Sequence, residues 1–306
     1  MKTTRQSNGV TRTTDEARVV VCIPAFNEEK SIAKVMLKAR EFADVIIVCD
    51  DGSTDMTGEI ARALGATVLA HDHNMGKGAA LATLFREAKS LSPKVVVTMD
   101  GDGQHDPSEI PLLDKPVLDG KADIAIGVRR MEGFAPGGRI VGNKVLDAMT
   151  SAKAGMDLHD TQSGFRAYSP VAIERIDFRQ RGMAVESQTL IDAASSGLRI
   201  AEVPVSVSYE GMKAKRNPVS HLSQVLDYLI TSTVADSPIL YLGLPGLVIL
   251  VLGVIAGFRV LDIFAATRQI AVGTGLIGVA LLIIGTIMMA TSLILKFLLI
   301  SDRRRT

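Results

Sequence analysis

Two long apolar runs near the C-terminus constrain this chain more than any other feature of its sequence. No charged residue occurs at positions 239–258 or at positions 270–295. Each run reaches the ~20 residues that a helix needs to cross a lipid bilayer. Only the short polar break at 259–269 separates them, so the two helices should run antiparallel and end on one side. A buried core hairpin in a soluble protein is the alternative.

The charges around these runs predict their orientation. Residues 303–305 are three consecutive arginines, which the positive-inside rule places in the cytoplasm. Arg259 and Arg268 in the break oppose this orientation, whereas residues 1–17 support it because they lack the apolar core of a signal peptide. The chain would be a multi-pass protein of the cell membrane or an endomembrane, with its remaining domain in the cytoplasm. The expected outer segments are a disordered tail at 1–17, a transmembrane hairpin at 238–300 and a basic cytoplasmic tail at 301–306.

A juxtamembrane segment at 213–237 has the spacing of an amphipathic helix. Its apolar residues recur three and four positions apart, namely Leu222, Val225, Leu226, Leu229, Ile230 and Val234. Polar residues, among them Gln224 and Asp227, occupy the other face. Such a helix either lies in the lipid headgroup layer or packs on the preceding domain, and the sequence leaves both open.

Strands and helices alternate before this segment. Apolar, β-branched runs predict strands, and apolar residues at helical spacing predict helices. The predicted strands are 19–23, 45–49, 67–70, 95–99 and 122–127, and the predicted helices are 28–42, 58–64 and 79–88. This order indicates an α/β fold with a mostly parallel sheet covered on both faces. Ligands of such sheets bind beyond the carboxyl ends of the strands.

Polar and acidic clusters follow four of the predicted strands. They occupy residues 24–29, 50–55, 71–78 and 100–106, so their side chains should gather at one edge of the sheet. The first strand is not followed by Gly-x-Gly-x-x-Gly, and the chain has no Walker-type loop. These absences disfavour a dinucleotide site and a P-loop site.

The cluster after the fourth strand has the composition of a metal site. Asp100, Asp102 and Gln104 alternate along the chain, so in an extended segment their oxygens share one face. Mg²⁺ and Mn²⁺ prefer such oxygen ligands. A cation there would neutralise the charge that develops on a departing diphosphate. The alternative is an acidic loop that only caps a helix beginning at Asp106, and His105 is more readily a loop residue than a ligand.

The net charge and the cysteine content argue against several classes of protein. The formal net charge of +1 gives no overall field that would attract nucleic acid. The two cysteines, Cys22 and Cys49, both fall in predicted buried strands, which predicts inert thiols rather than a disulfide framework or a zinc site. Two unpaired thiols fit a reducing compartment.

Six ordered motifs over residues 18–237 resemble family 2 glycosyltransferases. Val-Cys-Ile-Pro-Ala-Phe-Asn-Glu-Glu (21–29), Asp-Asp-Gly-Ser-Thr-Asp (50–55), Asn-Met-Gly-Lys-Gly-Ala-Ala (74–80) and Asp-Gly-Asp-Gly-Gln-His (100–105) are typical of the family. Asp-Thr-Gln-Ser-Gly-Phe-Arg (160–166) and Glu-Val-Pro-Val (202–205) are similar to the polyprenyl-phosphate, or dolichyl-phosphate, hexose synthases. The segment around Tyr209 and Asn217 looks like archaeal members that use glucose, N-acetylglucosamine or mannose.

The resemblance implies a glycosyltransferase A-type, Rossmann-like catalytic domain at 18–212. It implies a nucleotide site formed by Pro24, Ala25, Asn27, Glu28, Asp50, Asp51, Lys77, Asp100 and Gly101. The implied metal ligands are Asp100, Asp102 and Gln104, holding Mg²⁺ or Mn²⁺. The implied catalytic residues are Asp102, Asp160 and Arg129, and the implied acceptor and phosphate-binding residues are Arg139, Ser163, Arg166, Lys213 and Lys215. Arginine suits these roles because its planar fork of donors matches phosphate oxygens.

The chain departs from the mannose synthases of the family in one segment. Those enzymes carry an arginine and then Ser-Lys-Leu after the Glu-Val-Pro motif, whereas Tyr209 stands near that arginine here and Lys213, Lys215 and Arg216 follow. The basic residues either contact the anionic lipid head or form a juxtamembrane patch. The identity of the transferred sugar therefore stays open.

The expected reaction is a metal-dependent, inverting transfer of a hexose from a UDP- or GDP-linked donor to dolichyl or polyprenyl phosphate. An anionic lipid phosphate needs little help from a general base, so Asp160 either orients a group or removes a proton. Glu186 either supports the acceptor loop or is structural. A homo-oligomer is possible. The alternatives are another family 2 membrane enzyme of polysaccharide or glycolipid synthesis, a nucleotidyltransferase, and a non-catalytic membrane binding protein.

Overall fold

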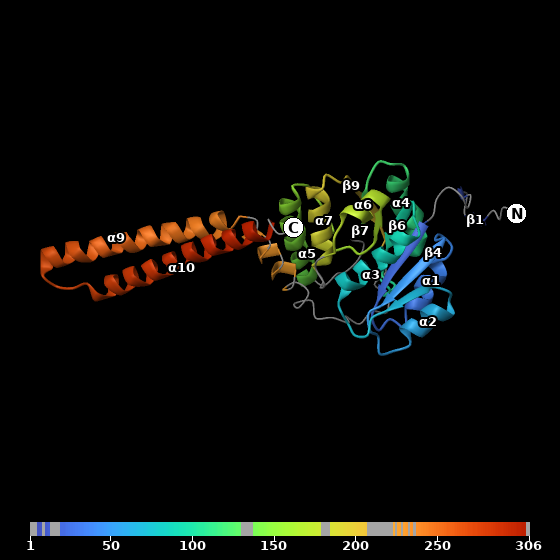
Figure 1. The fold of residues 1–306 in the computed structure, drawn as a ribbon, viewed down its shortest axis with the longest axis horizontal. Helices are drawn as coiled ribbons and strands as arrows, with labels where there is room; N and C mark the ends of the chain where they lie inside the picture. The colour runs from blue at the N-terminus through green and yellow to red at the C-terminus, as the bar shows by residue number, and fades with distance from the viewer. Residues whose placement is uncertain are drawn as a thin grey trace. The chain divides into compact units, whose positions relative to one another are not determined.

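A seven-stranded sheet organises the first part of the chain in this computed structural model (Figure 1). The strands run in the order β5 (Thr67–Ala70), β4 (Val45–Asp50), β3 (Val19–Ala25), β6 (Val95–Thr98), β8 (Arg166–Tyr168), β7 (Ile124–Arg129) and β9 (Ile200–Val205). Neighbouring strands are parallel except at β8, which lies antiparallel to both β6 and β7. The expected α/β fold with a mostly parallel sheet is therefore confirmed.

The described part of the chain divides into two compact units, Met1–Leu226 and Asp227–Thr306. The structure describes residues 5–7, 10–12, 19–129, 137–178, 184–206, 223, 225–227, 229–231, 233, 234 and 237–303. The expected acceptor residues Lys213 and Lys215 lie outside these ranges.

Strand β3 shows why the sheet forms where the sequence predicts it. Its residues Val19 to Ile23 are β-branched or small apolar residues and are fully buried. A strand covered on both faces needs such side chains at every position rather than at alternate ones. Alternate residues of β3 then enter two separate cores, one on each face of the sheet.

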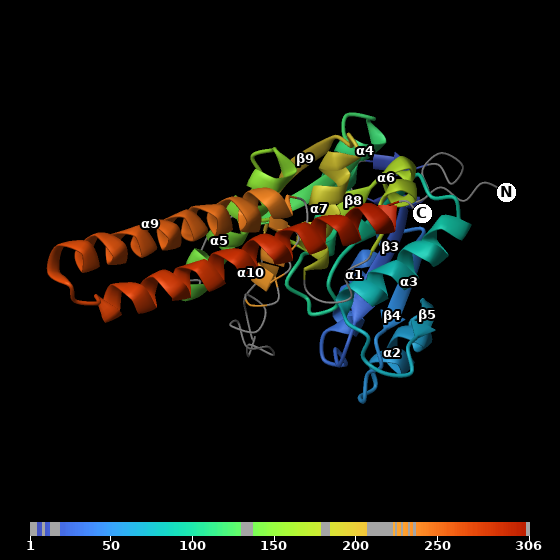
Figure 2. The ribbon, with the colours of Figure 1, turned by 60° about the vertical axis from the view of Figure 1, so that its left-hand side comes forward.

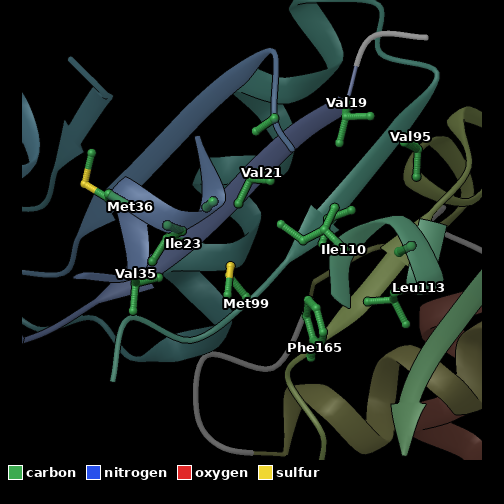
Figure 3. Packing of buried hydrophobic residues seen from close by; sticks show 14 of the residues in the cluster. Val19, Val21, Ile23, Val35, Met36, Val95, Met99, Ile110, Leu113 and Phe165 are labelled. Atoms are coloured by element: carbon green, nitrogen blue, oxygen red, sulfur yellow. The ribbon is translucent and has the colours of Figure 1, made fainter. Parts of the chain in front are cut away.

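Helices cover both faces of the sheet. Val19, Val21 and Ile23 pack with α1 (Ile32–Ala39), α2 (Thr57–Ala63) and α4 (Ile110–Leu118), and Figure 3 shows this core with Met99 and Phe165. Val20 and Cys22 pack on the opposite face with α3 (Lys77–Ser90), α6 (Pro170–Arg175) and α7 (Val185–Ser195). Helix α5 (Gly137–Ala154) packs against α7.

The strand order reverses between β3 and β6. From β3 the chain proceeds outward through β4 and β5 on one side, and then returns to place β6 on the other side of β3. Connections leave the two central strands in opposite directions, which opens a crevice at their carboxyl ends. The loops that begin after Ala25 and after Thr98 meet there.

Predicted and observed elements differ in several places, and helices α4, α5 and α6 and strand β9 were among those not predicted. Helix α1 is shorter than the expected 28–42, because Glu28 O already accepts hydrogen bonds from the backbone N–H groups of Ser31 and Ile32 in a turn that precedes the helix. Strand β8 was not predicted. Within the expected disordered tail, β1 (Arg5–Ser7) and β2 (Val10–Arg12) pair as an antiparallel hairpin, so these six residues differ from that expectation.

The amphipathic segment before the hairpin is helical at its described residues between 223 and 234. Val225 and Leu229 are buried, while Ile230, which the sequence places on the same apolar face, is exposed. The apolar face is therefore only partly covered by protein. Whether this segment contacts lipid headgroups stays a prediction.

The second unit is a hairpin of two long apolar helices, which lie side by side in Figure 2. A π-helical turn, η2 (Ile239–Gly243), leads into α9 (Leu244–Thr267), and α10 (Val272–Arg303) returns. Both are long and apolar enough to cross a membrane. Arg268, with φ +55°, ends α9 in the left-handed conformation.

Glycines set how closely α9 and α10 pack. A Cβ at Gly246 would lie 2.8 Å from the Met288 Cβ, and one at Gly285 would lie 2.6 Å from the Leu250 N. Small residues permit such backbone approach in apolar helix pairs. The Ser292 hydroxyl of α10 also donates a 3.0 Å hydrogen bond to the carbonyl of Pro238, the residue that precedes η2.

We expect Cys22 and Cys49 to resist maleimide labelling at neutral pH until the first unit unfolds. Both side chains are fully buried, burial raises the pKa of Cys22, and burial with the charges of Asp51 and Asp50 raises the pKa of Cys49 to about 12. Mass spectrometry of the native chain should show no label, and a Lys94→Cys variant, exposed at that position, should carry one. Rapid native labelling of either natural thiol would contradict this packing.

We expect Gly285→Leu to separate the two apolar helices. The added side chain would overlap the backbone of α9, a kind of overpacking that costs about 1–3 kcal/mol. Amide hydrogen exchange in detergent should accelerate in peptides of both helices. Gly257→Leu is the matched control, because no described atom lies within 4 Å of a Cβ at that position. Equal exchange in the two variants would argue against glycine-mediated packing.

Candidate active site

Three carboxylates crowd the crevice between the carboxyl ends of β3 and β6. Asp100 and Asp102 follow β6, and Glu28 follows β3. Burial raises the pKa of Asp102 to about 6, with the charge of Asp100 and then that of Glu28 adding to the rise. The backbone N–H of Gln104 and its side-chain Nε2 donate to the two oxygens of Asp102 at 3.0 Å and 2.6 Å. The crevice therefore holds more negative charge than its neighbours compensate.

Lys77 supplies the buried positive charge at this edge. Its Nζ lies 2.6 Å from Asp100 Oδ1 and 2.8 Å from Glu186 Oε1, and the Lys77 side chain is 13% exposed. Burial alone would lower the pKa of Lys77, but the charges of Asp100 and Glu186 outweigh burial and raise it. Lys77 begins α3, directly after Gly76 at φ +93°. The sequence assigned Lys77 to the nucleotide site, and the structure places it between two carboxylates.

Gly164 is required beside this ion pair. A Cβ on Gly164 would lie 2.7 Å from both Asp100 Oδ2 and Lys77 Nζ. The register of the sheet explains the approach, because Thr98 of β6 pairs with Arg166 of β8 and donates a 2.9 Å hydrogen bond to the Gly164 carbonyl. The antiparallel strand thus carries the loop at 160–165 to the same edge as Asp100.

The loops after β3 and β4 are joined on the expected nucleoside side. The side-chain Oδ1 of Asn27 accepts from Thr54 N at 2.8 Å, and the backbone N–H of Asn27 donates to Ser53 Oγ at 2.9 Å. Asn27 has φ +56°, a conformation that asparagine tolerates better than most residues. Asp50 accepts from Ser53 N at 3.0 Å. Pro24 and Ala25 end β3 beside this junction. Gly101 follows Asp100, and a Cβ added at Gly101 would lie 3.5 Å from side-chain atoms of Ile23, Ala25 and Ile32.

Asp51 joins the loops after β4 and β5. Its buried carboxylate accepts from Met75 N and Gly76 N, both at 2.9 Å, and lies 2.7 Å from His71 Nδ1. These contacts occupy both oxygens, so Asp51 shapes the loop that leads to Lys77. Gly52 allows the loops to meet, because a Cβ there would lie 2.5 Å from the carbonyl carbon of His73.

Arg129 and Asp160 form a bidentate ion pair at the end of β7. Asp160 Oδ2 accepts from Arg129 N at 2.9 Å and from Arg129 Nε at 2.7 Å, and Oδ1 accepts from the terminal Arg129 NH₂. Both side chains are largely buried, at 14% and 11% exposed. Asp160 has φ +50°, which is uncommon for a residue other than glycine. The structure thus joins two residues that the sequence named separately.

Ser163 belongs to the loop that leads into β8, and the guanidinium of Arg166, the first residue of β8, holds that loop together. The Arg166 guanidinium, 1% exposed, donates to the carbonyls of Ser163 at 2.8 Å, Thr161 at 2.6 Å and Glu186 at 3.1 Å. Ser163 is also buried. These hydrogen bonds give Arg166 a structural role in the loop, and the phosphate contact expected of Ser163 and Arg166 stays a prediction. Arg139 lies within α5, and its side chain is outside the described structure.

His105 is surrounded by the charged groups of the site. Burial lowers the pKa of His105 to about 4, and the nearby charges of Asp100 and Arg129 act in opposite directions. The ring stacks on Phe165 with centroids 5.1 Å apart. Among the described residues Nδ1 has no hydrogen-bond partner. His105 is therefore neutral and packed beneath the site at neutral pH.

The sequence missed several groups that shape the site. Asp147 of α5 accepts from Thr161 N and Oγ1, and Glu202 of β9 accepts from His159 N. Burial raises the pKa of Asp147, although the hydrogen bonds from Thr161 oppose the rise. Glu202 carried a signal, since it opens the Glu-Val-Pro-Val motif. Asp147 carried none, because a single acidic residue on a helix usually faces solvent.

The residues of the β6 loop fit a hard divalent cation. The described residues contain no cluster of three or more His, Cys, Asp or Glu side chains arranged to hold a metal. The expected set, however, has two carboxylates and an amide, and rotation of the Gln104 amide would present its oxygen. The like charges of Glu28, Asp100 and Asp102 would be relieved by a cation. The site chemistry therefore suits Mg²⁺ or Mn²⁺.

We expect Lys77→Met to destabilise the first unit by about 3 kcal/mol, because it removes the ammonium that pairs with the buried Glu186 carboxylate and the partly exposed Asp100 carboxylate. Calorimetry at pH 7 should register the loss. Lys38→Met is the matched control, since Lys38 pairs with Asp106 of the same loop at 3.5 Å but is half-exposed. Such a surface pair should cost less than ~1 kcal/mol. Similar losses in both variants would contradict the central position of Lys77.

Comparison with known proteins identifies the family. The sequence matches the model of glycosyl transferase family 2 over residues 20–177, just over half of the chain. It is 32% identical over 216 residues to a UDP-N-acetylglucosamine–dolichyl-phosphate N-acetylglucosaminyltransferase of Methanococcus voltae, which covers 62% of this chain and 86% of that protein. It is also 32% identical over 206 residues to a dolichyl-phosphate hexose transferase of Haloferax volcanii. That match covers 65% of this chain and 87% of that protein.

A solved structure agrees with this match. The fold is similar to that of glucosyl-3-phosphoglycerate synthase from Mycobacterium tuberculosis in complex with Mn²⁺ and uridine-diphosphate-glucose. The TM-score is 0.56 at 26% identity, and the similarity covers 71% of this chain and 78% of that one. The chain belongs to glycosyl transferase family 2, and its first unit has the glycosyltransferase A fold that the sequence motifs implied.

Proposed function

We propose that this glycosyltransferase transfers a hexose from a nucleotide diphosphate donor to a polyprenyl phosphate such as dolichyl phosphate. The observation that carries the proposal is the joint presence of a charged crevice at the strand-order reversal and two helices of membrane-crossing length on one chain. A crevice of this kind suits a diphosphate, and the helices suit an acceptor that stays in the bilayer.

The relatives support a lipid phosphate as the acceptor. Two of them are named for transfer to dolichyl phosphate, one with N-acetylglucosamine and one with a hexose. The structural relative binds UDP-glucose but is named for a soluble acid, glucosyl-3-phosphoglycerate. A soluble acid such as 3-phosphoglycerate is therefore the alternative to a lipid phosphate as the acceptor of this chain. The two apolar helices favour the lipid, because a chain that uses only soluble substrates has no need of a membrane anchor.

The reaction would be a single displacement with inversion at the anomeric carbon. A phosphate oxygen of the lipid forms a bond to that carbon while the bond from the carbon to the donor diphosphate oxygen breaks. The nucleoside diphosphate leaves with the bonding electron pair. No proton has to move, because the lipid phosphate is already anionic at neutral pH. The protein must align the two substrates and stabilise the negative charge that develops on the leaving group.

The positive groups of the crevice fit this task. Lys77 and Arg129 both lie near His105, between the ends of β6 and β7, where they would face the phosphates from two directions. A divalent cation held by Asp100, Asp102 and Gln104 would supply Lewis-acid neutralisation of the leaving diphosphate. Asp100 would then share its carboxylate between this cation and Lys77.

Asp160 fits an orienting role better than that of a general base. All of its described hydrogen bonds to Arg129 use carboxylate lone pairs that a base would need free. Asp160 would therefore keep the Arg129 guanidinium in place. The reaction needs nothing more from a carboxylate there, since the acceptor carries no proton that must be removed.

The test is a panel of radiolabelled UDP-glucose, UDP-N-acetylglucosamine and GDP-mannose, each with purified full-length chain in lipid nanodiscs. Parallel reactions contain dolichyl phosphate or 3-phosphoglycerate, with Mn²⁺, Mg²⁺ or EDTA. We expect label in the organic phase with one donor, only with dolichyl phosphate and only with a metal. Label transferred solely to 3-phosphoglycerate would overturn the proposed acceptor, and no transfer to either would overturn the proposed activity.

We expect Asp102→Ala to lower the transfer rate by about 10²-fold or more and to abolish the response to added Mn²⁺, because it removes a carboxylate from the proposed cation site. Asp106→Ala is the matched control, since this residue of the same loop caps the turn at Pro107–Glu109 and pairs only with half-exposed Lys38. Its metal response should equal that of the parent. An Mn²⁺-stimulated Asp102→Ala enzyme would refute the assignment of the metal ligands.

A further inference from the structure

The backbone of Asp160 is held in an unusual conformation by the residues on both sides of it. Asp160 has φ +50°, in the left-handed region that residues with a Cβ seldom occupy. Such outliers persist only where the surroundings determine them, and they cluster at functional sites. The carboxylate of Asp160 contacts Arg129, so its own side chain does not stabilise the turn locally.

Two carboxylates from different elements bind the neighbours of Asp160. On one side, Glu202 of β9 accepts a hydrogen bond from the backbone N–H of His159, and its second oxygen lies 3.0 Å from His159 Nδ1. On the other side, Asp147 of α5 accepts from Thr161 N at 2.8 Å and from Thr161 Oγ1 at 2.7 Å. Asp147 of α5 therefore fixes the peptide unit that follows Asp160, and Glu202 of β9 fixes the backbone and ring of the preceding residue, His159.

Asp147 and Glu202 together form a clamp around Asp160. The register of β7 and β9 places this clamp near Arg129. β9 is the parallel neighbour of β7, and Glu202 pairs with Ile126, while Arg129 lies at the carboxyl end of the same strand. A relaxation of Asp160 toward φ of about −60° would rotate its Cα–Cβ bond and take the carboxylate away from Arg129. The guanidinium would then lose both of the side-chain bonds that orient it.

We propose that Asp147 and Glu202 are positioning residues that hold Asp160 in its left-handed conformation and so fix the Arg129 guanidinium at the reaction site. This inference rests on the proposed function, in which Arg129 faces the reacting phosphates. Neither carboxylate has to contact a substrate. Each acts through the backbone of the residue that it binds, by accepting an N–H that would otherwise be free to turn.

The test is a double-mutant cycle between Asp147 and Asp160 in the full-length chain. We expect Asp147→Ala to lower kcat at least ~10-fold with little change in the KM for the donor, because a small displacement of a catalytic group has a large effect on rate. Asp147→Asn should restore most of the rate, since its amide oxygen still accepts from Thr161 N. In an Asp160→Ala background, Asp147→Ala should have less than about a twofold further effect.

Asp123 provides the matched control at the opposite end of the same strands. Asp123 accepts from Arg199 N at 2.9 Å and pairs with the Arg199 guanidinium, so it joins the starts of β7 and β9. Asp147 and Glu202, in contrast, bind the loop near the carboxyl end of β7. Asp123→Ala should lower the melting temperature, leave kcat unchanged and act independently of Asp160→Ala. An Asp147→Ala loss of kcat that is as large in the Asp160→Ala background as in the parent would overturn the proposal.

A thermal cycle separates failure of this inference from failure of the proposed function. Unfolding can be followed with a thiol-reactive dye, because the chain has only two cysteines and both are buried. The clamp predicts that Asp147→Ala lowers the melting temperature more in the parent than in the Asp160→Ala background. Coupled shifts without any sugar transfer would reject the function and keep the clamp. Additive shifts would reject the clamp even if transfer is observed.

Discussion

The buried ammonium group of Lys77 is the interaction on which the rest of the site depends. It lies between Asp100, which follows β6, and Glu186 in α7, two carboxylates from elements far apart in the sequence. Buried charges of one sign are costly unless a counter-ion and hydrogen bonds compensate them. Burial, together with the charges of Asp100 and Glu28, raises the pKa of Asp102, and the crowding of like charges is what suits the crevice to a divalent cation.

The antiparallel strand β8 determines which loops reach this crevice. Because β8 runs against its neighbours, the loop before it, rather than the loop after it, arrives at the carboxyl edge of β6 and β7. That loop carries Asp160 and Gly164. The Arg166 guanidinium then fastens the loop to α7 through three backbone carbonyls. A charged side chain inside the domain thus organises backbone.

Under the proposed function, the two units of the chain would divide the physical problem of a lipid-linked reaction. The first unit concentrates charge at a sheet edge, where a water-soluble diphosphate can bind. The second unit is apolar over most of its length, and glycines rather than polar contacts bring its helices together. Within the described residues, a hydrogen bond from Ser292 to the Pro238 carbonyl joins α10 to the segment that precedes α9. Close glycine packing suits a bilayer, where apolar side chains gain little by leaving lipid.

The sequence by itself determined the elements whose pattern is local. Continuous β-branched runs fixed β3, β4, β5 and β6, because a strand buried on both faces tolerates little else. The same reasoning placed Asp100 and Asp102 at the edge, and length together with apolar composition marked α9 and α10 as helices able to cross a bilayer. Strand β8 showed no such pattern, because it has only three residues and one of them is Arg166.

Tertiary structure alone decided which charged groups meet. Arg129 and Asp160 are 31 positions apart, His159 and Glu202 are 43 apart, and Thr161 and Asp147 are 14 apart. No periodicity connects such residues, so the ion pair, the clamp around Asp160 and the burial of Arg166 had no sequence signal. A side chain's residue type fixes what it can bind, but only the packing of strands and helices brings its partner within hydrogen-bond distance.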